Sequence, residues 1–155
     1  MFATGKVRQM SVTVRELRPD DHAVWGALWK GYCDFYHVAV PDAVTENTWA
    51  WLAGGAGPVW GLGAELDGRL AGFVTWQLHP VTWFAGVRCY LEDLYVAEDA
   101  RGRGLGRALI EAVYAAADRV GADNVYWFTN GDNAPARALY DRVGVYKGVV
   151  KYERK

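Results

Sequence analysis

The residues best suited to chemistry lie at 101–107, where arginine and glycine alternate in the run Arg-Gly-Arg-Gly-Leu-Gly-Arg. This run follows an apolar, strand-like segment (90–96) and opens a segment whose apolar residues recur at helical spacing. The first turn of a helix carries unpaired backbone N–H groups and the positive end of the helix dipole. Glycine lets a ligand approach the backbone, and arginine adds charged hydrogen-bond donors. The run therefore predicts a site for an anion, most simply a phosphate or pyrophosphate.

The common nucleotide motifs do not fit this run. A Walker loop ends in Gly-Lys-Ser/Thr, whereas this stretch continues as Gly106-Arg107-Ala108. A dinucleotide fingerprint requires a third glycine where Arg107 stands. The phosphate is therefore expected to belong to another kind of ligand, and phosphoryl transfer is disfavoured.

Two adjacent carboxylates, Glu92 and Asp93, interrupt the apolar segment before the glycine run. Neighbouring residues of a strand point to opposite faces, so at most one of the two is expected to face a given site. By alternation Glu92 shares a face with Tyr90, Leu94 and Val96, and we select it. A primary amine with a pKa near ~10.4 is almost fully protonated at neutral pH, and a carboxylate can bind the ammonium and relay its proton away. The alternative is one solvated carboxylate and one that is ion-paired or caps a helix.

Tyr140 is the second candidate for proton chemistry. It lies seven residues beyond Asn133, which is two helical turns, so one helix face presents both side chains. A tyrosine hydroxyl, with a pKa of about 10, is suited to giving a proton to a departing thiolate. The alternative is a core aromatic residue at helical spacing.

Several other chemistries are disfavoured by what the chain lacks. Its only serine is Ser11, before or within the first predicted strand, so a serine nucleophile in a Gly-x-Ser-x-Gly elbow is excluded. Its histidines, His22, His37 and His79, are scattered without metal-ligand spacing. No metal is expected.

The pattern Arg/Gln-x-x-Gly-x-Gly/Ala does fit the run, through Arg101, Gly104 and Gly106. It resembles the coenzyme A pyrophosphate loop of the GNAT acyltransferase superfamily. The resemblance extends to 91–96 and 132–140, covers most of 87–153 with high specificity, and reaches the rest of the chain from Val12 more loosely. It implies an N-acetyltransferase that moves an acetyl group from acetyl-CoA directly to a primary amine, without an acyl-enzyme. A catalytically silent module that binds coenzyme A, or a binder of nucleotide phosphates, stays open.

The resemblance also implies roles for single residues. Tyr140 would protonate the coenzyme A sulfur, Asn133 would contact the pantetheine arm, and Glu92 would bind or deprotonate the amine. The backbone of Leu94 and Val96 would pair with the pantetheine amides as an added strand does. The full set expected to hold the co-substrate is Leu94, Tyr95, Val96, Arg101, Gly102, Arg103, Gly104, Leu105, Gly106, Arg107, Asn133, Ala136 and Tyr140.

The acceptor is less sharply defined by the sequence. The segment 90–96 resembles that of spermidine/spermine-type, diamine and thialysine acetyltransferases, while histone-type relatives have a similar core. A polyamine, another small amine or a lysine side chain is therefore expected. Aromatic faces can hold an ammonium with about 0.5–2 kcal/mol of cation–π attraction. The residues expected to contact the acceptor are Trp29, Tyr36, Trp76, Glu92 and Asp93.

Composition bounds the class of protein. With 155 residues, 52% of them hydrophobic, the chain can bury one core without disulfides. A net charge of −1 gives no reason to expect nucleic acid or an anionic membrane as a partner. Cys33 and Cys89 lie far apart, as reduced thiols of a cytoplasmic protein would. We expect a loose leader at 1–10, followed by one domain at 11–155 with no membrane span.

The elements that must position the candidate residues follow from periodicity and turn signals. Helices are expected at 21–36, with an aspartate cap, at 45–52 after a loop at 40–43, at 105–120, and from Asp132 or Asn133 to 143. Strands are expected at 12–17, 59–66, 69–78, 87–96, 124–129 (central) and 146–152. The second hairpin strand should end at His79-Pro80, and a two-residue turn, Asp67-Gly68, should join it to the first.

Together these elements predict an α/β (α+β) domain of the GNAT fold. Its mixed, mostly antiparallel sheet should have about six or seven strands, flanked by about four helices. The last strand, 146–152, offers an edge through which a homodimer could pair.

Overall fold

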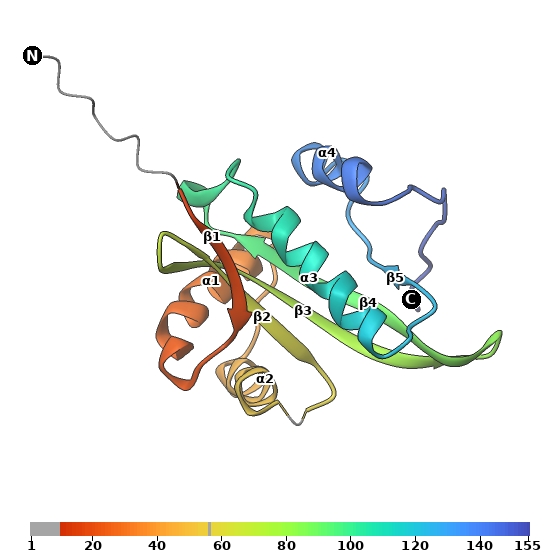
Figure 1. Cartoon of the computed structure of the whole chain (residues 1–155), viewed down its shortest axis with the longest axis horizontal. Coiled ribbons are helices and arrows are strands. Elements are labelled where there is room, and N and C mark those ends of the chain that lie inside the picture. The colour runs from red at the N-terminus through yellow and green to blue at the C-terminus, as the bar shows by residue number, and fades with distance from the viewer. Residues whose placement is uncertain (1–9, 56) are drawn as a thin grey trace, which may run out of the picture.

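The computed structural model describes residues 10–155 except residue 56, so nearly all of the expected leader lies outside the described residues. Five strands and four α-helices follow one another along the chain (Figure 1). The strands are β1 (Val12–Glu16), β2 (Trp60–Leu66), β3 (Arg69–Val81), β4 (Phe84–Val96) and β5 (Val125–Tyr126). The helices are α1 (His22–Phe35), α2 (Asp42–Gly54), α3 (Leu105–Arg119) and α4 (Ala134–Val143).

One sheet with the order β1-β2-β3-β4-β5 organises the chain. Its first four strands are antiparallel neighbours, and β5 runs parallel to β4. The expected α+β class is confirmed, with five strands in the described residues in place of the six or seven predicted.

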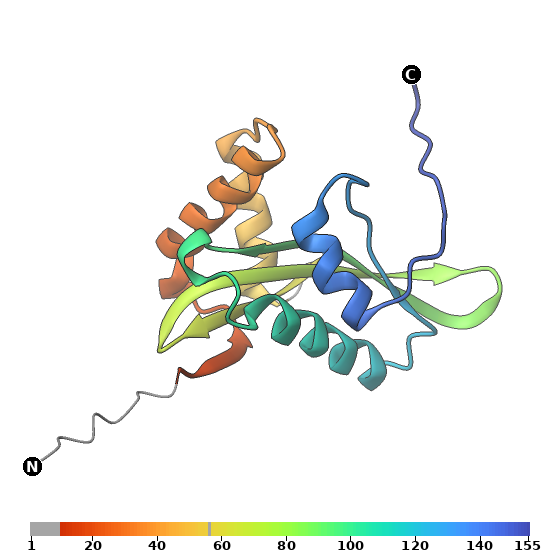
Figure 2. The ribbon, with the colours of Figure 1, turned by 90° about the horizontal axis from the view of Figure 1, so that it is seen from above.

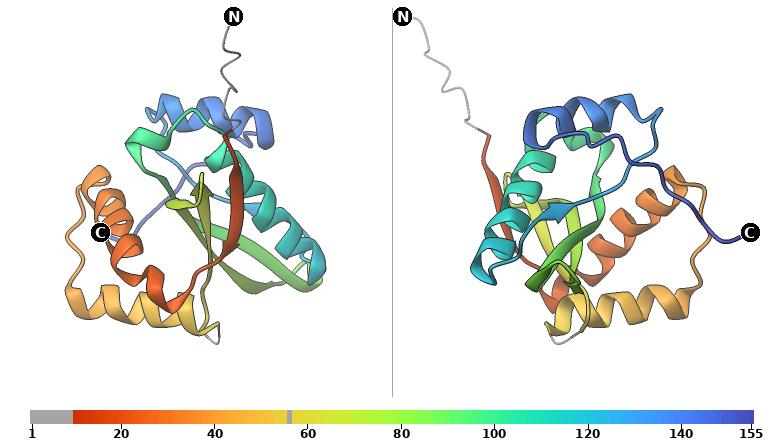
Figure 3. Two further views of the ribbon diagram at one scale, coloured as in Figure 1. Left: turned by 60° about the vertical axis from the view of Figure 1, so that its left-hand side comes forward. Right: turned by 90° about the vertical axis from the view of Figure 1, so that its right-hand side faces the viewer.

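The two faces of the sheet carry different helices (Figure 3). One face, with Val74, Trp76 and Leu91, packs against α3 in a core of buried aliphatic residues. The other face, with Phe73, packs against α1 and α2 in an aromatic core centred on the fully buried Trp25. Helix α4 lies beside α3 near the end of the sheet formed by β4 and β5 (Figure 2). No helix in the part of the chain that is described is both long and apolar enough to cross a membrane.

The β2–β3 and β3–β4 hairpins form most of the sheet. Asp67 and Gly68 have φ of 52° and 83°, as the predicted type I′ turn requires. The prediction that His79-Pro80 ends the strand is wrong, because β3 continues to Val81 and Pro80 pairs with Val87. Strand β2 accompanies β3 only as far as Trp76, so Pro80 lies where the other side of β3 is a free edge and no ladder bond is lost.

The beginnings of the first two helices also differ from the prediction. Asp21 does not cap α1 with its side chain. Its carboxylate accepts a hydrogen bond from the Arg18 N–H (2.7 Å) and two from the Arg15 guanidinium (2.7 and 2.9 Å), which ties β1 to α1. Helix α2 begins at Asp42, within the predicted loop, because the Pro41 carbonyl accepts from the N–H groups of Val44 (2.9 Å) and Thr45 (3.1 Å) and so starts the helix.

The largest differences lie at the C-terminal end. Strand β5 has two residues where six were predicted, and it forms the edge of the sheet rather than its centre. The predicted strand 146–152 is absent, since residues 145–155 form neither helix nor strand in this structure. A strand needs a neighbour with which to exchange hydrogen bonds, and β5 provides only a short one.

Two glycines of α1 provide a test of the packing between α1 and β4. A Cβ on Gly31 would overlap the Tyr95 hydroxyl and lie 2.8 Å from its Cζ, whereas a Cβ on Gly26 would meet nothing within 4 Å. We expect Gly31→Ala to lower the free energy of unfolding by about 1–3 kcal/mol through overpacking. Gly26→Ala should raise it by about 0.5–1 kcal/mol, because alanine loses less backbone freedom. Urea unfolding of both variants measures this, and equal effects would contradict the packing described.

Candidate active site

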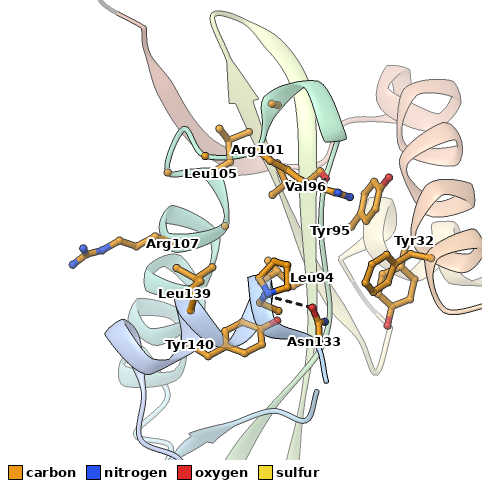
Figure 4. A pocket seen from close by; sticks show the side chains of 18 of the residues that line it. Tyr32, Leu94, Tyr95, Val96, Arg101, Leu105, Arg107, Asn133, Leu139 and Tyr140 are labelled. Carbon is orange, nitrogen blue, oxygen red and sulfur yellow. Dashed lines mark hydrogen bonds between the residues drawn. The ribbon is translucent and has the colours of Figure 1, made fainter. Parts of the chain in front are cut away.

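A cavity of about 510 Å³ lies between the second half of β4, the glycine run and α4 (Figure 4). Most of the residues expected to hold the co-substrate line it. They are Leu94, Tyr95, Val96, Arg101, Gly102, Gly104, Leu105, Gly106, Arg107, Asn133, Ala136 and Tyr140. Tyr32 of α1 and Tyr36, which directly follows this helix, form the opposite wall.

The cavity exists because β4 and β5 separate. The two strands pair only at Cys89–Val125 and Tyr90–Tyr126, and β4 then continues alone to Val96. The Ala97 N–H donates to the Ala71 carbonyl on β3 (2.8 Å), so alternation along β4 turns the backbone groups of Leu94 and Val96 to the opposite side, into the gap. A peptide-like ligand could therefore pair with β4 where β5 is missing.

The glycine run meets the geometric needs of an anion site. Gly102 and Gly104 have φ of 72° and 88°, which glycine adopts readily, and Gly104 is the N-cap of α3. The Ala108 N–H donates to the Gly104 carbonyl (3.0 Å), so the N–H groups of residues 105–107 precede the first intrahelical bond. These donors, together with the helix dipole, suit a pyrophosphate.

The three arginines of the run differ in position. The Arg101 Nε donates to the Val96 carbonyl (3.1 Å), and its guanidinium lies 5.6 Å from the centre of the Tyr95 ring. Arg107 pairs with Glu111 one turn later (2.7 Å), and both arginines line the cavity. Arg103 does not, because its guanidinium is directed toward Met10. The expectation that Arg103 holds the co-substrate is therefore not supported by its position.

Helix α4 brings Asn133 and Tyr140 to the cavity, as its periodicity predicted. The Asn133 side chain caps the helix by accepting from the Ala136 N–H (3.4 Å), and its Nδ2 donates to Thr129 Oγ1 (3.2 Å). The Tyr140 ring meets Trp127 edge to face, with 5.4 Å between ring centres. Burial, with a smaller contribution from Tyr36, raises the pKa of Tyr140 to about 12. Figure 4 shows both side chains on one side of the cavity and Tyr32 on the other.

A β-bulge corrects the prediction about the two carboxylates. Val74 pairs with Leu94 and Trp76 pairs with Leu91, which leaves Thr75 alone opposite both Glu92 and Asp93. The extra residue breaks the alternation of β4, so Glu92 and Asp93 both face the α1 side of the sheet. Leu94 and Val96 belong to the opposite face, in the core beside α3, and do not share a face with Glu92 as predicted.

The carboxylate pair is held by polar groups from β3 and α1. Thr75 Oγ1 donates to Asp93 Oδ2 (2.6 Å), and the Tyr32 hydroxyl is a second donor to this carboxylate. Burial raises the pKa of Asp93 despite these two bonds, which lower it. Gln77 Nε2 donates to Glu92 Oε2 (2.9 Å), and burial together with repulsion from Asp93 raises the pKa of Glu92.

Tyr36 connects the carboxylate pair to the cavity. Burial raises its pKa, the charge of Asp93 raises it further, and Tyr36 in turn raises the pKa of Tyr140. The Tyr36 hydroxyl also meets the Thr129 hydroxyl across the opening, between α1 and the segment after β5. Tyr36, Tyr140 and Asp93 are therefore close enough to interact electrostatically.

Two tryptophans predicted to contact the acceptor do not lie at this site. Trp76 is on the α3 face of the sheet, 8% exposed, because the alternation of β3 turns it away from Thr75 and Gln77. Trp29 stacks between Trp25 and Tyr32 and donates from Nε1 to Thr45 Oγ1 (3.1 Å), which joins α1 to α2. Neither residue lines the cavity.

The sequence did not predict some of the residues that line the cavity. Tyr32 belongs to the aromatic stripe of α1, but its spacing alone did not separate a core position from a wall of the site. Phe35, Pro135 and Leu139 line the cavity as apolar residues without a motif of their own. Within residues 10–155 other than residue 56, no group of three or more His, Cys, Asp or Glu side chains could hold a metal ion.

Comparisons with known proteins agree with this geometry. Residues 25–145 match the family described as the acetyltransferase (GNAT) family. A D-amino-acid N-acetyltransferase of Saccharomyces cerevisiae is 36% identical over 145 residues, which cover 92% of this chain and 90% of the yeast protein. An L-ornithine N5-acetyltransferase of Arabidopsis thaliana is 31% identical over 78 residues, or 50% of this chain and 34% of the plant protein.

The same fold occurs in a solved structure of an aminoglycoside N-acetyltransferase in complex with coenzyme A. It superimposes with a TM-score of 0.80 at 20% sequence identity, covering 96% of this chain and 97% of the other. This similarity concerns the fold, and together with the family match it confirms the GNAT fold that the sequence predicted.

Arg101 and Arg103 allow a test of the anion site, because replacing either one by alanine removes the same positive charge. We expect Arg101→Ala to weaken coenzyme A binding roughly tenfold or more, since a hydrogen bond to a charged group contributes about 1.5–3 kcal/mol. Arg103→Ala should change the affinity much less, because Arg103 points away from the cavity. Isothermal titration calorimetry at fixed ionic strength measures both. A larger loss for Arg103→Ala would place the phosphates elsewhere.

Proposed function

The chain belongs to the acetyltransferase (GNAT) family and is an acyltransferase, and we propose that it transfers an acetyl group from acetyl-CoA directly to a primary amine, without an acyl-enzyme. One observation carries the proposal: a single cavity is lined by the glycine run, by the proton donor Tyr140, and by Tyr32, whose hydroxyl donates to Asp93. The carboxylates Glu92 and Asp93 do not line the cavity themselves, but Asp93 lies next to the lining residues Tyr32 and Tyr36.

The described residues fit acetyl-CoA as the co-substrate. The N–H groups at the start of α3 and the guanidinium of Arg101 would hold the pyrophosphate. The free edge of β4 at Leu94 and Val96, with Asn133 opposite, would hold the pantetheine arm as an added strand. When bound, the co-substrate supplies a thioester, which is the activated form of the acetyl group.

The carboxylate pair is suited to receive the amine. A protonated amine cannot attack a thioester, so a nearby anion must both bind the ammonium and provide a route for its proton. Asp93 is held in place by Thr75 and Tyr32 and serves to bind the ammonium group. Glu92 is more exposed and holds one hydrogen bond, from Gln77, so it is the carboxylate free to accept the proton directly or through water.

Tyr140 serves the leaving group. Its raised pKa keeps the hydroxyl protonated throughout the neutral range, so it is always available as a donor. It donates a hydrogen bond to the negative charge that develops on the sulfur and supplies the proton as the thiol leaves.

The acceptor is proposed as a primary amine of a small molecule, with a lysine side chain as the other possibility. The relatives reported above are named for D-amino acids and ornithine, and not for polyamines or histones. Their names support an amine that stands on a small, polar molecule. The carboxylate pair supports any such acceptor through its ammonium group.

An acceptor panel tests the proposal. D-amino acids, ornithine, polyamines and a lysine peptide are each incubated with acetyl-CoA, and the released thiol is measured. Amine-dependent release together with an acetylated amine in the mass spectrum is expected. Tight coenzyme A binding without turnover on any amine would instead favour a silent coenzyme A-binding module.

Removal of the Tyr140 hydroxyl tests its role, with the best acceptor of the panel. We expect Tyr140→Phe to lower kcat by about 10²–10⁴-fold, which is the usual contribution of a general acid, while the affinity for coenzyme A is retained. Tyr114→Phe is the matched control, because the Tyr114 hydroxyl donates to the Val143 carbonyl (2.7 Å), away from the cavity. Unchanged turnover in Tyr140→Phe would remove Tyr140 from the mechanism.

The coupling between the carboxylates predicts a pH effect with a definite sign. The rate should rise with pH as Glu92 loses its proton, at a higher pH than for an ordinary carboxyl because its pKa is raised. The negative charge of Asp93 contributes to the raised pKa of Glu92. Asp93→Asn should therefore lower this pKa and move the acidic limb of the kcat/KM profile to lower pH. Glu92→Gln should depress the rate most at low pH, where the amine is least able to lose its proton unaided.

Rate profiles of the two variants from pH 5 to 10 measure this effect. An acidic limb that stays in place in both variants would exclude the carboxylate pair from proton transfer.

A further inference from the structure

An aromatic cluster lies on the α1 side of the sheet, next to the carboxylate pair. Tyr90 stands two residues before Glu92 on β4 and pairs with Tyr126 of β5. Both rings face the α1 side, because their strand neighbours Leu91 and Val125 belong to the core beside α3. Burial raises the pKa of Tyr90, and the charges of the two carboxylates raise it further, so the cluster begins where the pair ends.

Phe128 completes the cluster. It stands two residues after Tyr126, and its ring centre lies 5.9 Å from that of Tyr90 and 5.8 Å from that of Tyr126. The two tyrosine rings stack on each other with 5.2 Å between their centres. Aromatic rings at such distances are in contact. The three side chains therefore form one continuous apolar surface, which we call the aromatic floor (Tyr90, Tyr126 and Phe128).

His79 of β3 holds the aromatic floor from the far side. Its Nδ1 lies 3.0 Å from the Pro80 carbonyl, which can only accept, so the neutral imidazole donates there and accepts at Nε2 from the Tyr126 hydroxyl (2.9 Å). The imidazole also meets the Tyr126 ring edge to face, with 5.8 Å between ring centres. Tyr126 is thus fixed by Tyr90 on one side and by His79 on the other, and little ordering is left for ligand binding.

The aromatic floor is open. Within the described residues, the core beneath α1 and α2 includes β3 only as far as Phe73, and the β3–β4 hairpin extends beyond both helices (Figure 2). Phe128 is 48% exposed, and Glu92 at the border of the floor is exposed as well. An open apolar surface beside a site for a charged group is typical of a surface that binds a ligand.

The aromatic floor suits an apolar group better than a second ammonium. A cation is held by ring faces that are free to surround it, whereas these rings pack on one another. Arg88 lies near Tyr126, and its charge is matched by Asp123 through two hydrogen bonds (3.0 and 2.5 Å). The floor therefore adds no net charge, and the carboxylate pair is the part of this face that takes an ammonium.

We propose, on the basis of the amine acetylation proposed above, that the aromatic floor binds the body of the acceptor, so that the substrate is a primary amine carrying an aromatic group. Residues two apart along a strand lie about 7 Å apart, so the spacing of Tyr90 and Glu92 fits an ammonium and a ring joined by about two or three carbon atoms. Arylalkylamines and amino acids with aromatic side chains belong to this class.

Kinetics with 2-phenylethylamine and ethylamine, which differ by one phenyl group, test the proposal. The value of kcat/KM should be at least about tenfold higher for 2-phenylethylamine, because the floor removes its ring from water. Phe128→Ala should abolish most of this preference and leave kcat/KM for ethylamine unchanged. Trp83→Ala, the control, removes a ring that is 88% exposed at the hairpin turn and should leave the preference intact. Equal kcat/KM for the two amines, a preference that Phe128→Ala leaves unchanged, or a preference for 1,4-diaminobutane over 2-phenylethylamine would overturn the proposal.

Binding measurements separate a failure of the aromatic floor from a failure of acetyl transfer. Each amine is titrated by calorimetry into the chain saturated with coenzyme A, and retained coenzyme A affinity shows that Phe128→Ala is folded. Phe128→Leu, which removes only the flat ring, takes its place if it is not. Tighter binding of 2-phenylethylamine that is lost in the variant would support the floor even if no amine is acetylated. Acetylation of ethylamine without a preference for the phenyl group in rate or binding would refute the floor and leave the transfer reaction standing.

Discussion

The separation of β4 from β5 is the constraint on which the rest of this structure depends. The two strands share only two paired positions, after which the backbone groups of β4 at Leu94 and Val96 have no strand partner on that side. Buried backbone groups need hydrogen-bond partners, so the geometry of the opening suits a ligand that carries amides. The glycine run at the start of α3 lies at one end of this opening, and α4 with Tyr140 lies along its side. Removal of the gap would remove the cavity.

The β-bulge at Thr75 has a comparable effect on the acceptor side. It places Glu92 and Asp93 on the same face, where the charge of Asp93 helps to raise the pKa of Glu92. Thr75, Gln77 and Tyr32 supply the hydrogen bonds that keep the pair in position. Two partly desolvated carboxylates beside aromatic walls form a site that favours a cation, which is the form in which a primary amine arrives at neutral pH.

The sequence predicted what depends on local geometry. The glycine-rich start of α3 follows from the strand-to-helix pattern around residues 101–107, and the joint presentation of Asn133 and Tyr140 follows from a spacing of two helical turns. It could not predict the bulge, because the register of β3 against β4 is set by pairing between distant residues. The same limit explains why Trp76 was assigned to the wrong face of the sheet, because its face depends on that register. It also explains why a strand was predicted at 146–152, because a strand forms only where a neighbouring strand pairs with it. Arg103 differs from Arg101 only through the path of the loop.

The most direct measurement is a crystal structure of the chain with a conjugate in which coenzyme A is joined covalently to a primary amine. We predict phosphates at the N–H groups of residues 102–107, the pantetheine arm along Leu94 and Val96, the sulfur within hydrogen-bond reach of the Tyr140 hydroxyl, and the amine beside Glu92 and Asp93. A conjugate whose sulfur lies away from Tyr140, or whose amine leaves the cavity on the side opposite the carboxylates, would contradict this prediction.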